Sequence, residues 1–207
     1  SRSSWARVGL HVMALKHTVD RFGMLQVNLF NWSPSYSLVV RKGDAITLSL
    51  LNWTESLPLA QTIQLTADSL FLRMNQEVLP KSEGVPYFDP HRVDAAECMD
   101  MVPFSSIQPE EYDLLVLPTR ERPVIPPDHI GFITSAIEGL MQNSAQLDYA
   151  GSCGIRAVEL KVFKRVTITP ERHIANLTIY RADSLSLAPY EGRLGRTEES
   201  IIPIFGA

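Results

Sequence analysis

Prolines divide this sequence into short apolar runs, and that division limits what the chain can fold into. Its 207 residues include 14 prolines, and most of them lie between runs rich in valine, isoleucine, leucine and aromatic residues. Because proline has no backbone donor, it ends helices and stays out of the middle of sheets. Many short β-rich runs bounded by turn residues are typical of a barrel or a jelly roll. We expect strands at residues 24–30, 36–40, 45–51, 112–117, 155–163, 166–168 and 174–180.

Two segments have an apolar spacing closer to that of a helix. In residues 67–77 the apolar side chains fall at positions 67, 70, 71 and 74, with Asp68 in what would be the first turn. Residues 134–141 form a shorter candidate, which Thr134 or Ser135 would open. We therefore predict a mainly β chain with two short helices.

Composition argues against several classes of function. The formal net charge is −4 and the pI is about 5.7, which does not fit a general nucleic-acid or membrane-surface binder. No apolar run approaches the roughly 18–20 residues of a transmembrane helix. Cys98 and Cys153 have no metal-type spacing, and two lone thiols fit a reducing compartment, so we expect a cytoplasmic protein. The basic side chains near the last strands are interpreted as a solvated edge and turn: Lys161, Lys164, Arg165 and Arg172.

The first ten residues, SRSSWARVGL, carry the pattern that bears most on function. If residues 4–7 form one helical turn, Ser4 and Arg7 lie on the same face. The hydroxyls of Ser3 and Ser4 and the guanidinium of Arg7 would then reach a single anion, because arginine offers a forked set of donors. The same spacing also fits an ordinary helix cap. The residues alone leave both interpretations open.

This segment resembles the phosphate-binding motif of the dUTPase and dCTP deaminase family, in which a serine pair, an arginine and a Gly-Leu follow in that order. Val19-Asp20 and residues 25–31 and 38–46 resemble the family's nucleoside-holding hairpin and the strands after it. The resemblance implies a dUTPase-like fold, a β-clip that forms a distorted barrel or jelly roll. It also implies that the two serines and Arg7 bind the phosphates of a deoxynucleoside triphosphate.

Residues 19–50 and 147–180 are similar in the order and spacing of an aspartate, a glycine, two strands and a charged turn. We therefore predict tandem copies of the family's domain, with residues 1–66 as the C-terminal part of a first copy and residues 67–207 as the second. The first copy is expected to be N-terminally incomplete, in a fragment of a longer protein, because the chain opens inside a motif. Further segments that resemble family elements lie at 107–114, 123–131 and 190–193.

Each of the two predicted copies lacks a functional residue that the other keeps. Residues 133–140 resemble the phosphate motif, but we place Glu138 at the arginine position, where a carboxylate would repel phosphate. Glu159 matches the family's catalytic glutamate, whereas the first copy has Asn28 or a neighbour there, and an amide cannot take a proton from water. We therefore predict one composite site of Ser3, Ser4 and Arg7 with Glu159, formed either within one chain or between chains. The alternative is that both copies have lost their function.

The resemblance implies hydrolytic deamination of dCTP to dUTP and ammonia, with a water activated by Glu159 and no metal bound by the protein. No cysteine or histidine set has the spacing of a zinc deaminase. By the same resemblance, Asp20 and Asp148 lie at the sugar end of the nucleoside. Tyr149 either stacks on the sugar or is a hairpin aromatic. Magnesium would arrive with the triphosphate.

Two other functions stay open. One is dUTP pyrophosphatase activity, in which Asp148 or Asp20 would hold the attacking water. The other is a non-catalytic nucleotide-binding or regulatory module. In each case the expected partner is a deoxynucleoside triphosphate, and the expected assembly is a homo-oligomer, since members of the family are commonly trimers.

Overall fold

The computed structural model describes residues 3–14, 27–44, 57–126, 128–142, 147–149 and 157–181. Strands dominate this part of the chain, and its two helices, α1 (Ser3–Arg7) and α2 (Ala95–Cys98), are each about one turn long. No helix among the described residues combines the length and the apolar character that crossing a membrane requires. The expectation of a mainly β chain is therefore confirmed.

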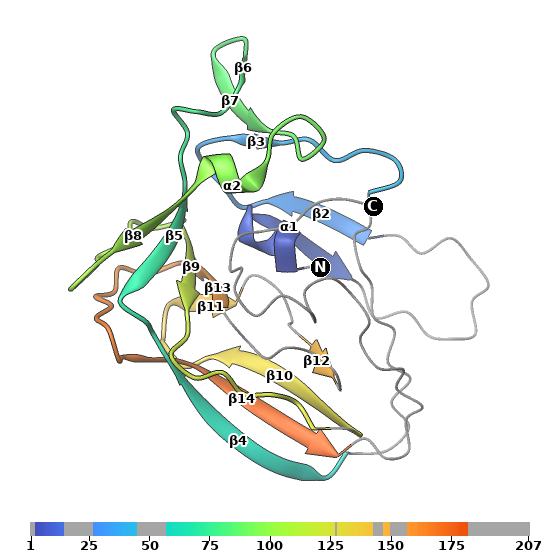
Figure 1. Cartoon of the computed structure of the whole chain (residues 1–207), viewed down its shortest axis with the longest axis vertical. Coiled ribbons are helices and arrows are strands. Elements are labelled where there is room, and N and C mark those ends of the chain that lie inside the picture. Colours follow the sequence, from blue (N-terminus) through green and yellow to red (C-terminus); the bar gives the residue numbers. More distant parts are fainter. Residues whose placement is uncertain are drawn as a thin grey trace.

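Two antiparallel sheets make up most of the structure (Figure 1). The four-stranded sheet has the order β12-β10-β14-β4 and the five-stranded sheet has the order β11-β13-β9-β5-β8. The strands of the first are β4 (Leu59–Thr66), β10 (His129–Ser135), β12 (Leu147–Tyr149) and β14 (His173–Arg181). The strands of the second are β5 (Leu70–Met74), β8 (Met99–Pro103), β9 (Leu114–Pro118), β11 (Leu140–Gln142) and β13 (Ala157–Val162).

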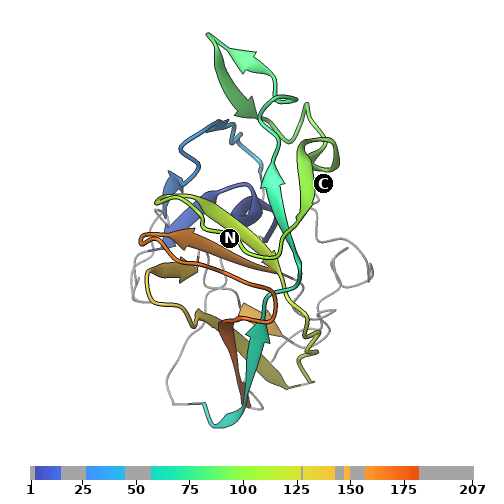
Figure 2. The same cartoon turned by 90° about the vertical axis from the view of Figure 1, so that its left-hand side faces the viewer.

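Two smaller sheets complete the described fold. One is the hairpin of β1 (Leu10–Ala14) and β2 (Val27–Asn31). The other joins β3 (Ser37–Leu38), β6 (Lys81–Ser82) and β7 (Val85–Phe88). In both views the segment of α1, β1 and β2 lies beside β9 and β13 (Figures 1 and 2).

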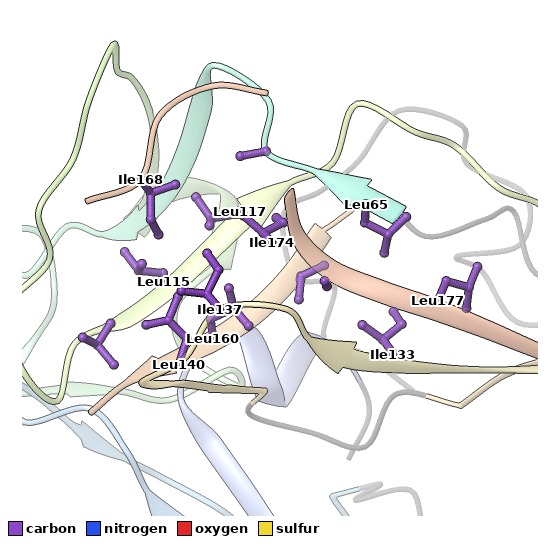
Figure 3. Close-up of a cluster of buried hydrophobic side chains, with 14 of the residues drawn as sticks. Leu65, Leu115, Leu117, Ile133, Ile137, Leu140, Leu160, Ile168, Ile174 and Leu177 are labelled. Atoms are coloured by element: carbon purple, nitrogen blue, oxygen red, sulfur yellow. The ribbon is translucent and has the colours of Figure 1, made fainter. Parts of the chain in front are cut away.

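The first apolar core takes side chains from both large sheets (Figure 3). Leu115 and Leu117 of β9 and Leu160 of β13 meet Ile133 of β10 and Leu177 of β14 there, and each is buried. A fully buried leucine or isoleucine contributes about 1.5–3 kcal/mol through removal from water, so this cluster supplies much of the stability that holds the two sheets together.

A second apolar core lies on the other face of β9 and β13. It contains Trp5 and Val8 from the N-terminal segment together with Leu72, Val116 and Ala157. Because side chains alternate along a strand, residues 158, 160 and 162 of β13 enter the first core while residues 157, 159 and 161 face the second. This alternation points two charged side chains, Glu159 and Lys161, toward the N-terminal segment.

The predicted helix at residues 67–77 is wrong. This segment contains strand β5, which pairs antiparallel with β8 from Leu70 opposite Pro103 to Met74 opposite Met99. Leu72 and Met74 enter the second core, whereas Phe71 packs against the first. A strand with apolar residues on both faces loses the alternation that would identify it, and its spacing then resembles that of a helix.

The predicted helix at residues 134–141 is wrong as well. Strand β10 runs to Ser135, and β11 begins at Leu140 after a turn in which Gly139 has φ +84°. The Ser135 hydroxyl accepts from the Ile137 amide at 3.3 Å. The hydroxyl therefore closes a turn instead of opening a helix.

Over the residues that the structure describes, the expected strands at 24–30, 112–117, 155–163 and 174–180 are confirmed as β2, β9, β13 and β14. The run at 36–40 keeps two strand residues, and the run at 166–168 contributes one isolated bridge, from Ile168 to Ile107. Residues 45–51 lie outside the described part. Residues on both sides of position 66 share a sheet and a core, and the division into two copies stays a prediction.

Candidate functional site

The N-terminal segment is held by its apolar residues. Helix α1 forms the single turn expected for residues 4–7, and it ends where Gly9, at φ +93°, donates its amide to the Ala6 carbonyl at 3.0 Å. Trp5 and Val8 are buried in the second core. They anchor the turn on the sheet, so Arg7 between them points into the protein and is almost fully buried.

Strand β13 positions Glu159. Its pairing with β9 places Glu159 opposite Val116, and its neighbours Val158 and Leu160 are fixed in the first core. A slip of one residue would exchange the two faces and bury Glu159 among leucines, so the apolar neighbours also specify where the carboxylate points.

The structure brings Arg7 and Glu159 together, although 152 residues separate them. Nε of Arg7 donates to Oε1 of Glu159 at 3.0 Å, and the side chains are 6% and 0% exposed. The second carboxylate oxygen, Oε2, is buried and has no hydrogen-bond partner within the described residues. A buried carboxylate oxygen without a donor is costly, so this atom marks a place where a further donor would bind favourably.

Burial sets the protonation chemistry of the pair. It raises the pKa of the Glu159 carboxyl above its ordinary value of 4.5, while the charge and the hydrogen bond of Arg7 act in the opposite direction. A raised pKa makes the carboxylate a better proton acceptor than an exposed glutamate, which suits a group that takes a proton and later returns it.

The two hairpins predicted to correspond have similar geometry. Leu10 pairs with Asn31, and the Trp32 amide donates to the Gly9 carbonyl at 2.9 Å. In the other hairpin the matching contacts are Leu140 with Val162, and the Phe163 amide to the Gly139 carbonyl at 2.8 Å. Both glycines have positive φ.

This register corrects one prediction. Counting back from the paired glycines places Ile137, not Glu138, at the position equivalent to Arg7. Ile137 is buried in the first core, whereas Glu138 is exposed and pairs with Lys164 at 3.0 Å. The same counting makes Asn28 the residue equivalent to Glu159, as expected. An isoleucine has no donor for phosphate, so the second hairpin lacks the cation for a reason different from the one predicted.

The remaining predicted site residues are only partly visible. Ser3 and Ser4 begin α1, but their side chains lie outside the described part. Asp148 and Tyr149 lie in β12 opposite Gly131 and Ile130, again without described side chains. Asp20 and residues 190–193 lie outside the described residues altogether.

Sequence reasoning missed one residue on the same face of β13. The sequence predicts Lys161 in a solvated edge, but the side chain is only 4% exposed. Its neighbours Lys164 and Arg165 are exposed, as expected. Among the described residues, no group of three or more histidine, cysteine, aspartate or glutamate side chains is arranged to hold a metal ion.

Comparison with known proteins gives a likeness in fold. The structure resembles the 2'-deoxycytidine 5'-triphosphate deaminase from Agrobacterium tumefaciens with a TM-score of 0.59 and 15% identity, covering 91% of this chain and 68% of that one. A second match is the native dUTPase of EIAV, at 21% identity and a TM-score of 0.34, covering 60% of this chain and 98% of that one. No protein-family model matches the chain, and no curated protein matches it by sequence. The match to the deaminase shows that this chain has the same fold as that protein, which agrees with the fold that the sequence resemblance implies, while the tandem arrangement stays a prediction.

Proposed function

We propose that this chain is a hydrolase that deaminates deoxycytidine triphosphate, giving deoxyuridine triphosphate and ammonia. The observation that supports it is the buried pair of Arg7 and Glu159, in a chain with the fold of a dCTP deaminase. Arg7 and Glu159 belong to separate sequence motifs, and in the structure their side chains are hydrogen-bonded to each other. A buried ion pair of this kind is weak evidence for stability, so its retention calls for another reason.

In this proposal Glu159 activates the attacking water. Arg7 holds Oε1, and the reacting water donates to Oε2, the oxygen without a partner among the described residues. The carboxylate takes one proton from the water as its oxygen bonds to C4 of the cytosine ring, and the electrons of the C4=N3 double bond move onto N3. The protonated carboxyl then delivers that proton to the amino group, the bond from C4 to that group breaks as the C4=N3 bond re-forms, and ammonia leaves. The remaining hydroxyl proton moves to N3, which gives the uracil ring. One carboxyl with a raised pKa performs both transfers in turn.

The segment before Arg7 binds the phosphates. Ser3 and Ser4 supply hydroxyl donors, and Arg7 contributes positive charge beside them. Asp20 and Asp148 lie at the sugar end, and Tyr149 stacks on the deoxyribose. Magnesium enters with the triphosphate, and the reaction needs no metal bound by the protein. The assembly is a homo-oligomer.

The deciding experiment measures ammonia release from dCTP and magnesium by the purified protein. Glu159→Gln is expected to lower the rate by roughly 100-fold to 10,000-fold, the usual contribution of a general acid–base group, while calorimetry still detects dCTP binding. Glu138→Gln is the matched control, because Glu138 is an exposed carboxylate on a nearby turn. It is expected to leave the rate unchanged.

Several outcomes would contradict the proposal. Full activity in Glu159→Gln would remove Glu159 from the mechanism. Formation of dUMP and pyrophosphate from dUTP, without ammonia from dCTP, would assign the chain to dUTP pyrophosphatase chemistry. Binding of the triphosphate without any turnover would identify a non-catalytic nucleotide-binding module.

A further inference from the structure

A buried lysine lies on the strand that carries Glu159. Lys161 is two residues along β13 on the same face, and its ammonium donates to the carbonyls of Trp32 and Tyr112. The Nζ atom also lies 6.0 Å from the centre of the Trp32 ring. Two neighbouring charges on one strand face thus contact the N-terminal segment, Glu159 through Arg7 and Lys161 through Trp32.

Arg7 and Trp32 belong to a single structural unit. The Gly9 carbonyl, two residues after Arg7, accepts from the Trp32 amide at 2.9 Å, and the pairing of β1 with β2 continues from that point. The Trp32 ring is itself fixed, because it stacks on His11 with ring centres 4.0 Å apart. A contact to Trp32 therefore also limits the movement of Arg7.

Hydrogen bonds therefore join the N-terminal segment to β13 at two places, Arg7 to Glu159 and Trp32 to Lys161. Within the N-terminal segment, the hydrogen bond from the Trp32 amide to the Gly9 carbonyl connects these two places. Trp5 and Val8 hold the N-terminal turn on the sheet by apolar contacts, which have little directionality. The Arg7–Glu159 hydrogen bond ties the turn to one point of β13, and a second polar attachment two residues away, about 7 Å along the strand, fixes the register between the two segments.

The cost of burying Lys161 argues for such a role. Desolvation of an ammonium costs several kcal/mol in real proteins, and this burial lowers the pKa of Lys161, with Asp113 acting in the opposite direction. An apolar side chain of similar length would fill the same space without that penalty. A charge retained here needs a benefit other than packing.

We propose that Lys161 is a positioning residue, which holds the segment carrying Arg7 in register with Glu159. The kinetic consequence rests on the proposed function, whereas the contact itself does not. Lys161→Met removes the donor at similar length, and Lys161→Arg keeps a cationic donor. Lys164→Met is the control, since Lys164 is an exposed lysine three residues further along that pairs with Glu138.

The direct test observes the Nε–H group of Arg7 by nuclear magnetic resonance, in protein labelled with nitrogen-15. In the unaltered protein this proton is expected to exchange slowly with solvent, because it is buried against Glu159, and Arg7→Lys identifies its signal. Lys161→Met is expected to speed the exchange at least tenfold. Lys161→Arg and Lys164→Met are expected to keep it slow. Unchanged exchange in Lys161→Met would overturn the proposal.

The kinetic test compares ammonia release with stability. Lys161→Met is expected to lower kcat/KM for dCTP at least tenfold while its urea midpoint stays close to that of the unaltered protein, and Lys161→Arg is expected to restore most of the activity. A loss of activity that only follows a loss of folded protein would indicate a structural residue. If Lys161→Met fails to fold, Lys161→Gln replaces it, and failure of both overturns the positioning role.

The two proposals fail separately. If the unaltered protein releases no ammonia but Lys161→Met still loosens the Arg7 Nε–H, the positioning role stands and the proposed activity is wrong. If ammonia is released and Lys161→Met keeps both the full rate and slow exchange, the activity stands and the positioning role is wrong.

Discussion

Replacing Arg7 alone is expected to cost much more stability than replacing Arg7 and Glu159 together. Arg7→Met leaves the Glu159 carboxylate buried without its donor, and with the two side chains only 6% and 0% exposed, solvent screens little of the loss. Breaking a buried pair on one side typically costs about 3–5 kcal/mol. Replacing both partners with apolar side chains, as in Arg7→Met with Glu159→Leu, is often neutral or stabilising by about 1–4 kcal/mol.

The cost of Arg7→Met should also depend on pH in a definite direction. Burial raises the pKa of Glu159, and Arg7 opposes that rise, so removing Arg7 raises the pKa further. A carboxyl whose pKa is higher in the folded than in the unfolded state favours folding below the unfolded pKa. That contribution is lost as the pH rises through the folded pKa. The deficit of Arg7→Met therefore grows as the pH rises through the folded pKa values and shrinks as the pH falls toward 4.5, the ordinary value.

Urea denaturation of the unaltered protein, both single variants and the double variant, at pH 7.5 and pH 5, measures this coupling. Asp44 and Glu121 have pKa values lowered from 3.8 and 4.5, so both stay ionised at pH 7.5 and at pH 5 and keep their contributions in every variant, and the differences isolate Glu159. Arg73→Met is the matched control. Its partner Asp100 lies 3.9 Å away and both side chains are exposed, so the loss should stay below about 1 kcal/mol. Additive single losses, or a cost of Arg7→Met that is equal at both pH values, would refute the reasoning.

Two further predictions concern the backbone and the support of α1. Gly139→Ala should lower the free energy of unfolding more than Gly84→Ala. Both glycines have φ +84°, a backbone conformation that costs an L-residue roughly 1–2 kcal/mol. Only at Gly139 would the new Cβ also lie 2.5 Å from the Cβ of Lys164. Equal losses of stability for the two variants in thermal denaturation would show that Lys164 moves aside without cost. Tyr36→Phe should cost about 1–3 kcal/mol, because the buried Tyr36 hydroxyl donates to the Val8 carbonyl at 3.0 Å, and an unchanged melting temperature would contradict that.

The fold class could be predicted because its signals are local. Prolines and β-branched runs define β9, β13 and β14 without any long-range information. The error at β5 arose where local signals conflict with position in the fold. Phe71 faces one core while Leu72 and Met74 face the other, so the strand is apolar on both sides. Nothing in residues 67–77 by themselves reveals the two cores, since these are built by segments far away in the chain.

The sequence predicts the residues of the candidate site but not the hydrogen bond between them. Arg7 and Glu159 each follow from a resemblance to a motif, but the hydrogen bond between them depends on α1 packing against β13. Lys161 was missed because its charged neighbours at 164 and 165 suggested a solvated edge. A signal was present: residues 158, 160 and 162 are apolar, and the only charges in the strand fall on the alternate face, at 159 and 161.

This alternation separates stability from chemistry along one strand. The face with Val158, Leu160 and Val162 holds the sheets together, whereas the face with Glu159 and Lys161 buries charges that an apolar core would avoid. If the double replacement of Arg7 and Glu159 folds as well as the unaltered protein, the pair is dispensable for the fold. If this double variant is stable but releases no ammonia, the ion pair serves catalysis and not the fold.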